Sequence, residues 1–253
     1  TKAAYAEKAD FLDQDKDVVI LNKLSEDLGV LRQSLLFTGL EVLAHNINRR
    51  QKDLKLFEFG SVYRKSSKGY TEGKKLSLLL TGNSTKENWL EPVKKVSFPE
   101  LYAVVESLLT KLNIPYPEVN IVESNPFTFG LELMVNKQII GTIGLVDPIL
   151  SKLAEVRQDV YFAEIDRGKL TKIARSQGRF EEISKFPEVR RDLSLVIDAG
   201  LTFDQIRQIA EKSGGKLLKR ISVFDMYKGD KLEDGKKAYA LSFYLQDDQK
   251  TLT

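Results

Sequence analysis

The sequence of 253 residues contains no cysteine and a single histidine, His45. Without cysteine the chain has neither disulfides nor thiolate metal sites, and with one histidine it has no multi-histidine metal centre and no Cys–His nucleophile pair. No stretch approaches the roughly 18 consecutive apolar residues that a membrane-spanning helix needs. We therefore expect a protein without a metal site that contacts no membrane, and the lack of cysteine is compatible with a cytoplasmic location.

Charge of either sign is not in large excess either, because 39 basic side chains face 36 acidic ones and leave a net charge of +3. This balance excludes a strongly basic nucleic-acid coat, although a local basic patch can still bind RNA. The length predicts one large or two smaller domains. The chain begins with Thr1 rather than Met and shows no signal-peptide pattern, so we expect it to be part of a longer protein.

The segment from Leu28 to Arg64 is the clearest core-building unit. Apolar residues recur there at three- and four-residue steps after Ser34, which predicts an amphipathic helix with Ser34 accepting a hydrogen bond from a first-turn amide. A polar turn at 48–53 follows, and then an apolar run that predicts a buried strand through Tyr63. The apolar face of the helix is formed by Leu36, Leu40, Leu43, Ala44 and Ile47.

Patterning divides the rest of the chain into two parts. Strands are predicted at 18–21, 76–80, 119–122, 128–135, 138–145 and 160–165, with helices at 98–112 and 148–153. We place a first domain at 1–170, a linker at 171–179 and a second domain at 180–253. The second domain reads as a strand (192–197), a helix capped by Thr202, and two long strands, which is the first part of a ferredoxin-like fold. That fold needs one more helix and strand, so we expect this domain to be incomplete at its C-terminus.

Four short motifs occur in an order that resembles a known family. They are Asn22-Lys23-Leu24-Ser25 with Leu31-Arg32-Gln33-Ser34-Leu35-Leu36, Leu56-Phe57-Glu58-Phe59-Gly60, Ile140-Gly141-Thr142-Ile143-Gly144 with Asp147-Pro148, and Phe186-Pro187 with Arg190-Arg191-Asp192-Leu193. This set is similar to the C-terminal part of the bacterial phenylalanyl-tRNA synthetase β-subunit family. The chain departs from the family pattern at Lys23, where Pro is usual, and at Gln33, where Thr is usual.

The resemblance implies an α+β chain in which a catalytically silent, class II synthetase-like antiparallel module precedes a ferredoxin-like anticodon-binding domain. It further implies a non-catalytic part of an aminoacyl-tRNA ligase that organises the α subunit in an (αβ)2 heterotetramer and contacts tRNA(Phe) during protein biosynthesis. ATP and Mg²⁺ would serve the parent complex, with no cofactor in this chain. The family role of the helix predicts that Leu36, Leu40, Leu43 and Ile47 form a subunit interface and are partly exposed. The alternative is a scaffold that binds only protein.

Three features that suggest independent chemistry each have a simpler explanation. A working class II site needs arginines that neutralise the nucleotide phosphates, and the strand around Glu58 has Leu56 where the motif-2 arginine is expected. Gly141 and Gly144 lie within a predicted β-hairpin and lack the Lys-Ser/Thr of a phosphate-binding loop, so we expect close packing there. His45 has no identifiable catalytic partner. We predict a structural ion pair between Arg32 and Glu58, since a buried charge needs pairing.

The candidate RNA-binding residues lie in the second domain. Strand alternation places aromatic residues on the face away from the helix, where aromatic rings can stack on unpaired bases and nearby cations can meet phosphates. From the residues alone, an ordinary solvated face is equally supported, because acidic residues there roughly balance the basic ones; the family resemblance favours tRNA contact. The candidates are Arg190, Arg191, Lys219, Arg220, Phe224, Lys228 and Tyr244.

Overall fold

The structure is a computed structural model that describes residues 5, 7–23, 29–122, 126–174, 184–229 and 232–252. The chain divides into two compact units, Thr1–Gly178 (unit 1) and Arg179–Thr253 (unit 2). Each unit has its own sheet and is described separately. Leu24 and Ser25 of the first family-like motif, residues 175–179 of the predicted linker, residues 180–183 of the predicted second domain and Thr253 lie outside the described residues.

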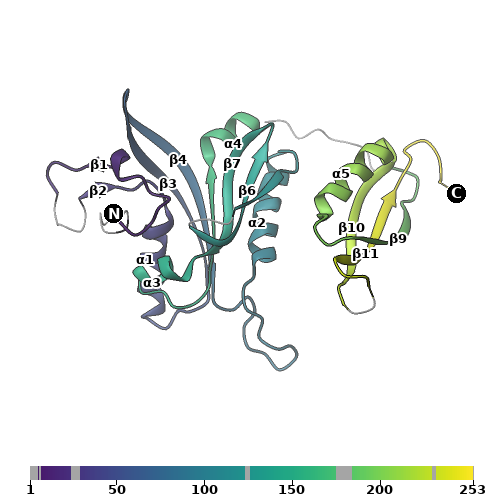
Figure 1. Cartoon of the computed structure of the whole chain (residues 1–253), viewed down its shortest axis with the longest axis horizontal. Helices are drawn as coiled ribbons and strands as arrows, with labels where there is room; N and C mark the ends of the chain where they lie inside the picture. The colour runs from purple at the N-terminus through teal and green to yellow at the C-terminus, as the bar shows by residue number, and fades with distance from the viewer. Residues whose placement is uncertain are drawn as a thin grey trace. The chain divides into compact units, whose positions relative to one another are not determined.

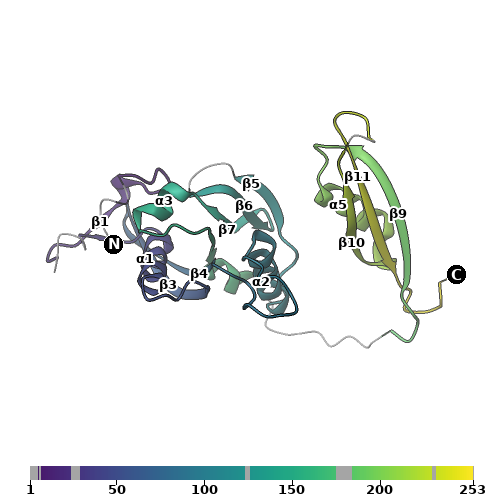
Figure 2. The ribbon, with the colours of Figure 1, turned by 90° about the horizontal axis from the view of Figure 1, so that it is seen from below.

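Unit 1 is built on a six-stranded antiparallel sheet with the strand order β3-β4-β8-β7-β6-β5 (Figures 1 and 2). Strands β3 and β4 form a long hairpin, and β3 is one edge of the sheet. A separate two-stranded ladder joins β1 (Val18–Val19) to β2 (Val30–Leu31). The six strands are β3 (Leu54–Ser66), β4 (Gly69–Thr81), β5 (Glu118–Val122), β6 (Phe127–Val135), β7 (Gln138–Val146) and β8 (Val160–Asp166).

Helices cover both faces of this sheet (Figure 1). Helices α1 (Leu36–Ile47) and α3 (Pro148–Leu153) pack on one face, and helix α2 (Phe98–Lys111) and the short helix α4 (Arg167–Ile173) pack on the other. Each face has its own apolar cluster, because side chains of successive strand residues point to opposite sides. Helix α4 belongs to unit 1, with Leu170 buried against the sheet, so residues 171–173 of the predicted linker are part of a helix.

The predicted exposure of the α1 face is wrong. Leu36, Leu40 and Leu43 are fully buried, and Ile47 is partly buried against the same cluster. The face packs on Leu79 of β4 and Phe162 of β8 within the same chain. Helical periodicity shows that a face is covered but does not distinguish cover by the chain's own sheet from cover by a partner. These four residues are therefore part of the chain's own core.

The β6–β7 hairpin was predicted correctly, and its glycines make the close packing possible. Asn136 and Lys137 form its two-residue turn, and both have the positive φ angles, 51° and 61°, that such a turn requires. A Cβ atom on Gly141 would lie 2.6 Å from the backbone oxygen of Glu164, and one on Gly144 would lie 2.5 Å from that of Phe129. The two glycines thus allow close approach of neighbouring backbones, as expected.

Unit 2 is a three-stranded antiparallel sheet with the order β10-β11-β9, covered on one face by helix α5 (Figure 2). Thr202 caps α5 as predicted: its hydroxyl accepts from the Gln205 amide, and the Gln205 side chain accepts from the Thr202 amide. Its small core includes Ile206, Tyr239 and Leu241. The elements are β9 (Val189–Asp198), α5 (Phe203–Gly214), β10 (Leu218–Tyr227) and β11 (Lys236–Leu245).

Candidate nucleic-acid interface

The face of the unit 2 sheet opposite α5 brings four of the predicted RNA-binding residues together. Tyr244 of β11 lies directly between Arg190 of β9 and Arg220 of β10 in the strand register. Phe224 comes from an irregular step in the β10–β11 pairing between Val223 and Asp225. Because residues that are opposite each other in an antiparallel sheet point to the same side, these groups share one face.

The four side chains alternate between aromatic rings and guanidinium groups. The Arg190 guanidinium lies 5.3 Å from the centre of the Phe224 ring and 6.0 Å from that of Tyr244. The Arg220 guanidinium lies 3.5 Å from the centre of the Tyr244 ring. Each ring thus faces a cation, which is a stabilising arrangement worth roughly 0.5–1 kcal/mol per contact at exposed sites. We call this set of four residues the aromatic–arginine ladder.

Two residues outside the predicted RNA-binding set hold the ladder in place. Asp192 accepts two hydrogen bonds from Arg190, at 2.8 and 3.0 Å, and one from the buried Ser242 hydroxyl at 2.8 Å. The bond from Arg190, followed by that from Ser242, lowers the pKa of Asp192, and the same pairing raises the pKa of Arg190. A strand spacing of two residues puts Asp192 beside Arg190, so alternation was the signal that could have revealed it.

The other three predicted residues do not join the ladder. Arg191 pairs in register with Phe243, whose side chain packs in the α5-side core, so it lies on the opposite face from Arg190. Lys219 forms an ion pair with Asp248 at 3.3 Å, and Lys228 follows the last residue of β10. Glu188 lies 3.5 Å from Arg220, so acidic groups offset part of the positive charge of the ladder.

In unit 1 the predicted ion pair is confirmed: Arg32 Nη2 lies 2.7 Å from Glu58 Oε1. Arg32 also donates to the Ser61 carbonyl and the Thr38 hydroxyl, and Gly60 leaves room for the guanidinium, since a Cβ there would lie 2.5 Å from Nη2. A second carboxylate on the same sheet face, Glu164, accepts from the Ser34 hydroxyl at 2.9 Å and from the Leu35 amide at 2.8 Å. Both carboxylates are therefore bound by residues of the segment that precedes α1.

Gln33, where the chain departs from the family pattern, is itself a buried anchor. Its amide donates to the Asp13 carbonyl at 2.6 Å and to the Asp17 carboxylate at 2.8 Å. Ser34 is not the N-cap of α1 as predicted: the N-cap is Leu35, which makes no side-chain capping bond. The Ser34 hydroxyl does accept from the Leu36 amide at 3.2 Å. His45 is exposed on α1. In the described ranges, no helix is long and apolar enough to cross a membrane, and no group of three or more His, Cys, Asp or Glu residues could hold a metal ion.

Comparison with solved structures supports the fold class. The chain is similar to a pyrrolysyl-tRNA synthetase from Desulfitobacterium hafniense, with a TM-score of 0.50 and 15% identity over 68% of this chain and 60% of that one. At this identity the likeness concerns the fold alone. It agrees with the predicted fold class, a class II synthetase-like antiparallel module followed by a ferredoxin-fold domain.

Sequence comparison defines the family. A model described as "Phenylalanyl tRNA synthetase beta chain CLM domain" matches residues 1–167, and one described as "Ferredoxin-fold anticodon binding domain" matches residues 184–253. The chain belongs to the phenylalanyl-tRNA synthetase β-chain family.

Named relatives match nearly the whole chain. It is 38% identical to the phenylalanine–tRNA ligase β subunit of Bacteroides fragilis, over 100% of this chain and 32% of that protein. It is 31% identical to the β subunit of Bacillus subtilis, over 96% of this chain and 31% of that protein. The chain therefore spans about a third of the length of these relatives.

Proposed function

We propose that this chain is a non-catalytic part of a phenylalanine–tRNA ligase, which contacts tRNA through unit 2 and the ligase α subunit through unit 1. The observation that carries the RNA contact is the aromatic–arginine ladder on the open sheet face. Stacking of a base on an aromatic ring is worth about 1–3 kcal/mol, and guanidinium groups pair with phosphates. A ladder held by Asp192 and Ser242 offers both kinds of contact with little loss of side-chain entropy on binding.

The silent role of unit 1 is supported by the two carboxylates on the α1 face of its sheet. Glu58 and Glu164 are both engaged by the chain itself, through Arg32 and through Ser34 with Leu35. Carboxylates that already accept from protein donors are not disposed to bind a metal or a substrate ammonium group. The proposed ligase activity, with its ATP and Mg²⁺, therefore belongs to the parent complex, in an (αβ)2 heterotetramer in the cytoplasm.

For the contact with the α subunit, we propose the edge strand β3 in place of the buried face of α1. Phe57 and Phe59 are 69% and 58% exposed, and their rings touch edge to face with centroids 5.9 Å apart. The Arg167 guanidinium lies over Phe59 at 5.5 Å. Exposed aromatic pairs with a neighbouring arginine are typical anchors of protein interfaces. In a complex with the α subunit, Phe57→Ser and Phe59→Ser should weaken association, whereas exposed Tyr70→Ser at the hairpin turn should not.

The RNA contact is tested by two adjacent arginines that lie on opposite sheet faces. Arg190→Ala should weaken tRNA binding about tenfold in filter-binding titrations, because it removes the central cation of the ladder. Arg191→Ala changes the net charge identically but lies on the α5 side, so it should have little effect. Equal effects of the two substitutions would show that binding responds only to net charge, and this would favour a protein-only scaffold.

A further inference from the structure

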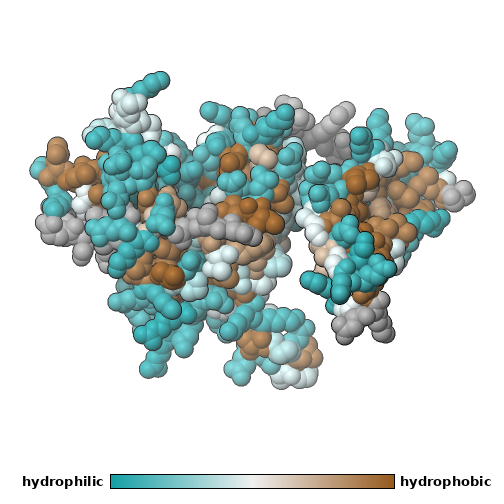
Figure 3. Space-filling model, in the orientation of Figure 1, coloured by the Kyte–Doolittle hydropathy of each residue, from teal (hydrophilic) through white to brown (hydrophobic). Residues whose placement is uncertain are grey.

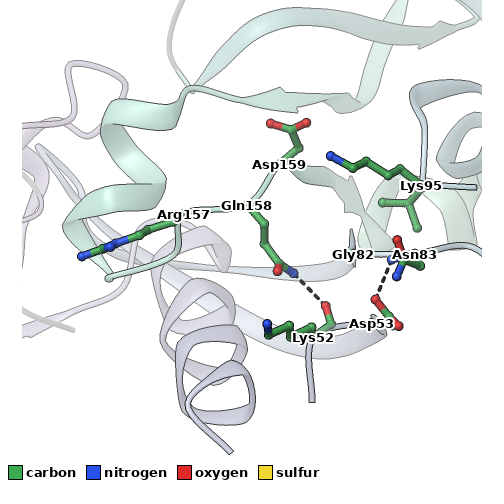
Figure 4. Close-up of a pocket in the computed structure, with 9 residues that line it drawn as sticks. Lys52, Asp53, Gly82, Asn83, Lys95, Arg157, Gln158 and Asp159 are labelled. Carbon is green, nitrogen blue, oxygen red and sulfur yellow. Dashed lines mark hydrogen bonds between the residues drawn. The ribbon is translucent and has the colours of Figure 1, made fainter. Parts of the chain in front are cut away.

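The end of unit 1 formed by the entrance to β3 and the exit of β4 contains a hollow of about 320 Å³ (Figure 4). It lies outside the ladder and the Arg32–Glu58 site. The hollow is lined by Lys52, Asp53, Gly82, Asn83, Lys95, Val96, Arg157, Gln158 and Asp159.

The lining backbone is held rigidly. Gln158 Nε2 donates to the Lys52 carbonyl and to the Thr81 hydroxyl, each at 2.7 Å, and the Asp53 carboxylate accepts from the Asn83 amide at 2.7 Å. Gly82 adopts φ +83°, and a Cβ there would lie 2.3 Å from the Lys52 oxygen. This hollow is therefore a fixed feature that joins four separate segments of the chain, 52–53, 82–83, 95–96 and 157–159.

The cations of the hollow are exposed and free to meet a ligand. Within the part of the chain that the structure describes, Lys52, Lys95 and Arg157 form no ion pair. The lining also contains two carboxylates, Asp53, which accepts from the Asn83 backbone amide, and Asp159. Lys52 and Arg157 also line a neighbouring hollow, to which Lys152 adds a cation and Glu155 a carboxylate. Unpaired lysine and arginine side chains along a groove are suited to phosphate groups.

A loop that starts from this hollow carries the only tryptophan of the chain. Residues 83–96 protrude from unit 1, with Asn83 and Lys95 bridged at the root (Figure 1). Asn88 Oδ1 accepts from the Leu90 and Glu91 amides and shapes the tip. Trp89 is 94% exposed and Leu90 71%, and Figure 3 shows hydrophobic residues on this loop. An ordered loop that holds a tryptophan in solvent is an expected contact for a binding partner.

We propose that the hollow and the Trp89 loop form a second RNA-binding site, in which Lys52, Lys95 and Arg157 contact backbone phosphates and Trp89 stacks on an unpaired base. Aromatic rings that stack on bases and cations that follow the backbone are the combination by which proteins bind single-stranded segments of nucleic acid, and here the loop that carries Trp89 starts from the hollow that holds the cations. This site extends the proposed function of the chain, but it does not depend on the ladder of unit 2. A protein groove that accepts Trp89 and Leu90 is the competing occupant.

The test uses the full chain and unmodified tRNA at several salt concentrations. The double substitution Lys52→Ala with Arg157→Ala should lower the slope of log Kd against log salt by about 1–2, since each lost phosphate contact contributes up to about 0.9. The matched control, Lys65→Ala with Lys68→Ala, removes two exposed lysines at the distant β3–β4 turn and should leave the slope unchanged. Measuring both pairs in an Arg190→Ala background separates this site from the ladder.

Trp89 provides the second measurement, because it is the sole tryptophan. Saturating tRNA should quench and shift its fluorescence, and Lys52→Ala with Arg157→Ala should reduce this change at a fixed tRNA concentration. Equal salt slopes in the two double variants would overturn the proposal. The absence of tRNA binding by the chain would also overturn it. Unchanged Trp89 fluorescence at saturating tRNA would overturn it as well, and this outcome would favour a protein partner for the loop.

Discussion

Substitution of Leu40 by alanine distinguishes a core helix face from an interface face. Leu40 is fully buried in the cluster shared by α1, β4 and β8. The helix lies so close to the sheet that a Cβ on the neighbouring Gly39 would come 2.7 Å from Leu79 Cδ1. Two closely packed backbones have little room to collapse around a lost side chain, so we expect a cost in the middle of the usual range, about 3 kcal/mol. For a unit of this size, that lowers Tm by roughly 6–12 °C.

Scanning calorimetry of the full chain measures this loss, and Val42→Ala on the same helix is the control. Val42 is 48% exposed and should change the free energy of unfolding by no more than about 0.5 kcal/mol. Leu241→Ala, in the core of unit 2, identifies the transition that belongs to the other unit. If Leu40→Ala costs no more than Val42→Ala, then the α1 face is not part of the core and the correction made above is wrong.

Two further predictions concern side chains that cap helices, Asp166 at the start of α4 and Thr202 at the start of α5. Burial raises the pKa of Asp166, but the Lys169 amide and the Lys75 ammonium outweigh it, so the pKa falls below the ordinary 3.8. The ionised Asp166 carboxylate therefore stabilises the fold above about pH 3.8, and this stabilisation is lost as the pH falls through its lowered pKa. In urea titrations, the loss of unfolding free energy caused by Asp166→Asn should therefore become smaller as the solution is acidified. A loss that does not change with pH would contradict this. Thr202→Ala should destabilise unit 2 by about 1 kcal/mol, because it removes the capping contact with Gln205. In thermal unfolding Thr202→Ser should retain most of that stability, and equal losses in the two variants would exclude the capping explanation.

Periodicity predicted most of the elements, since each helix and strand has an apolar pattern that its own residues determine. The β6–β7 hairpin and the Thr202 cap were predicted from short-range signals, and the Arg32–Glu58 pair was predicted because a buried charge needs a partner. Placement across the chain was harder, because the same apolar face of α1 suits a partner or the chain's own sheet. Only the fold brings Phe162 and Leu79 to that face.

The candidate RNA-binding residues show the same limit. Alternation along one strand separates Arg190 from Arg191, but the register between strands decides that Arg190, Tyr244 and Arg220 meet. The basic hollow was missed altogether, since Lys52, Lys95 and Arg157 are far apart in the sequence and each looks like an ordinary surface residue. No local sequence pattern predicts a site whose cations come from three distant segments of the chain.

A site-specific cross-link tests the central claim most directly. A photoreactive p-benzoylphenylalanine at Phe224 lies in the ladder, and the same group at Ile209 lies on the exposed side of α5, which covers the other sheet face. On irradiation with tRNA(Phe), position 224 should cross-link to the anticodon arm, and position 209 should give little product. Equal cross-linking at both positions, or none at 224, would contradict the assignment of this face to tRNA.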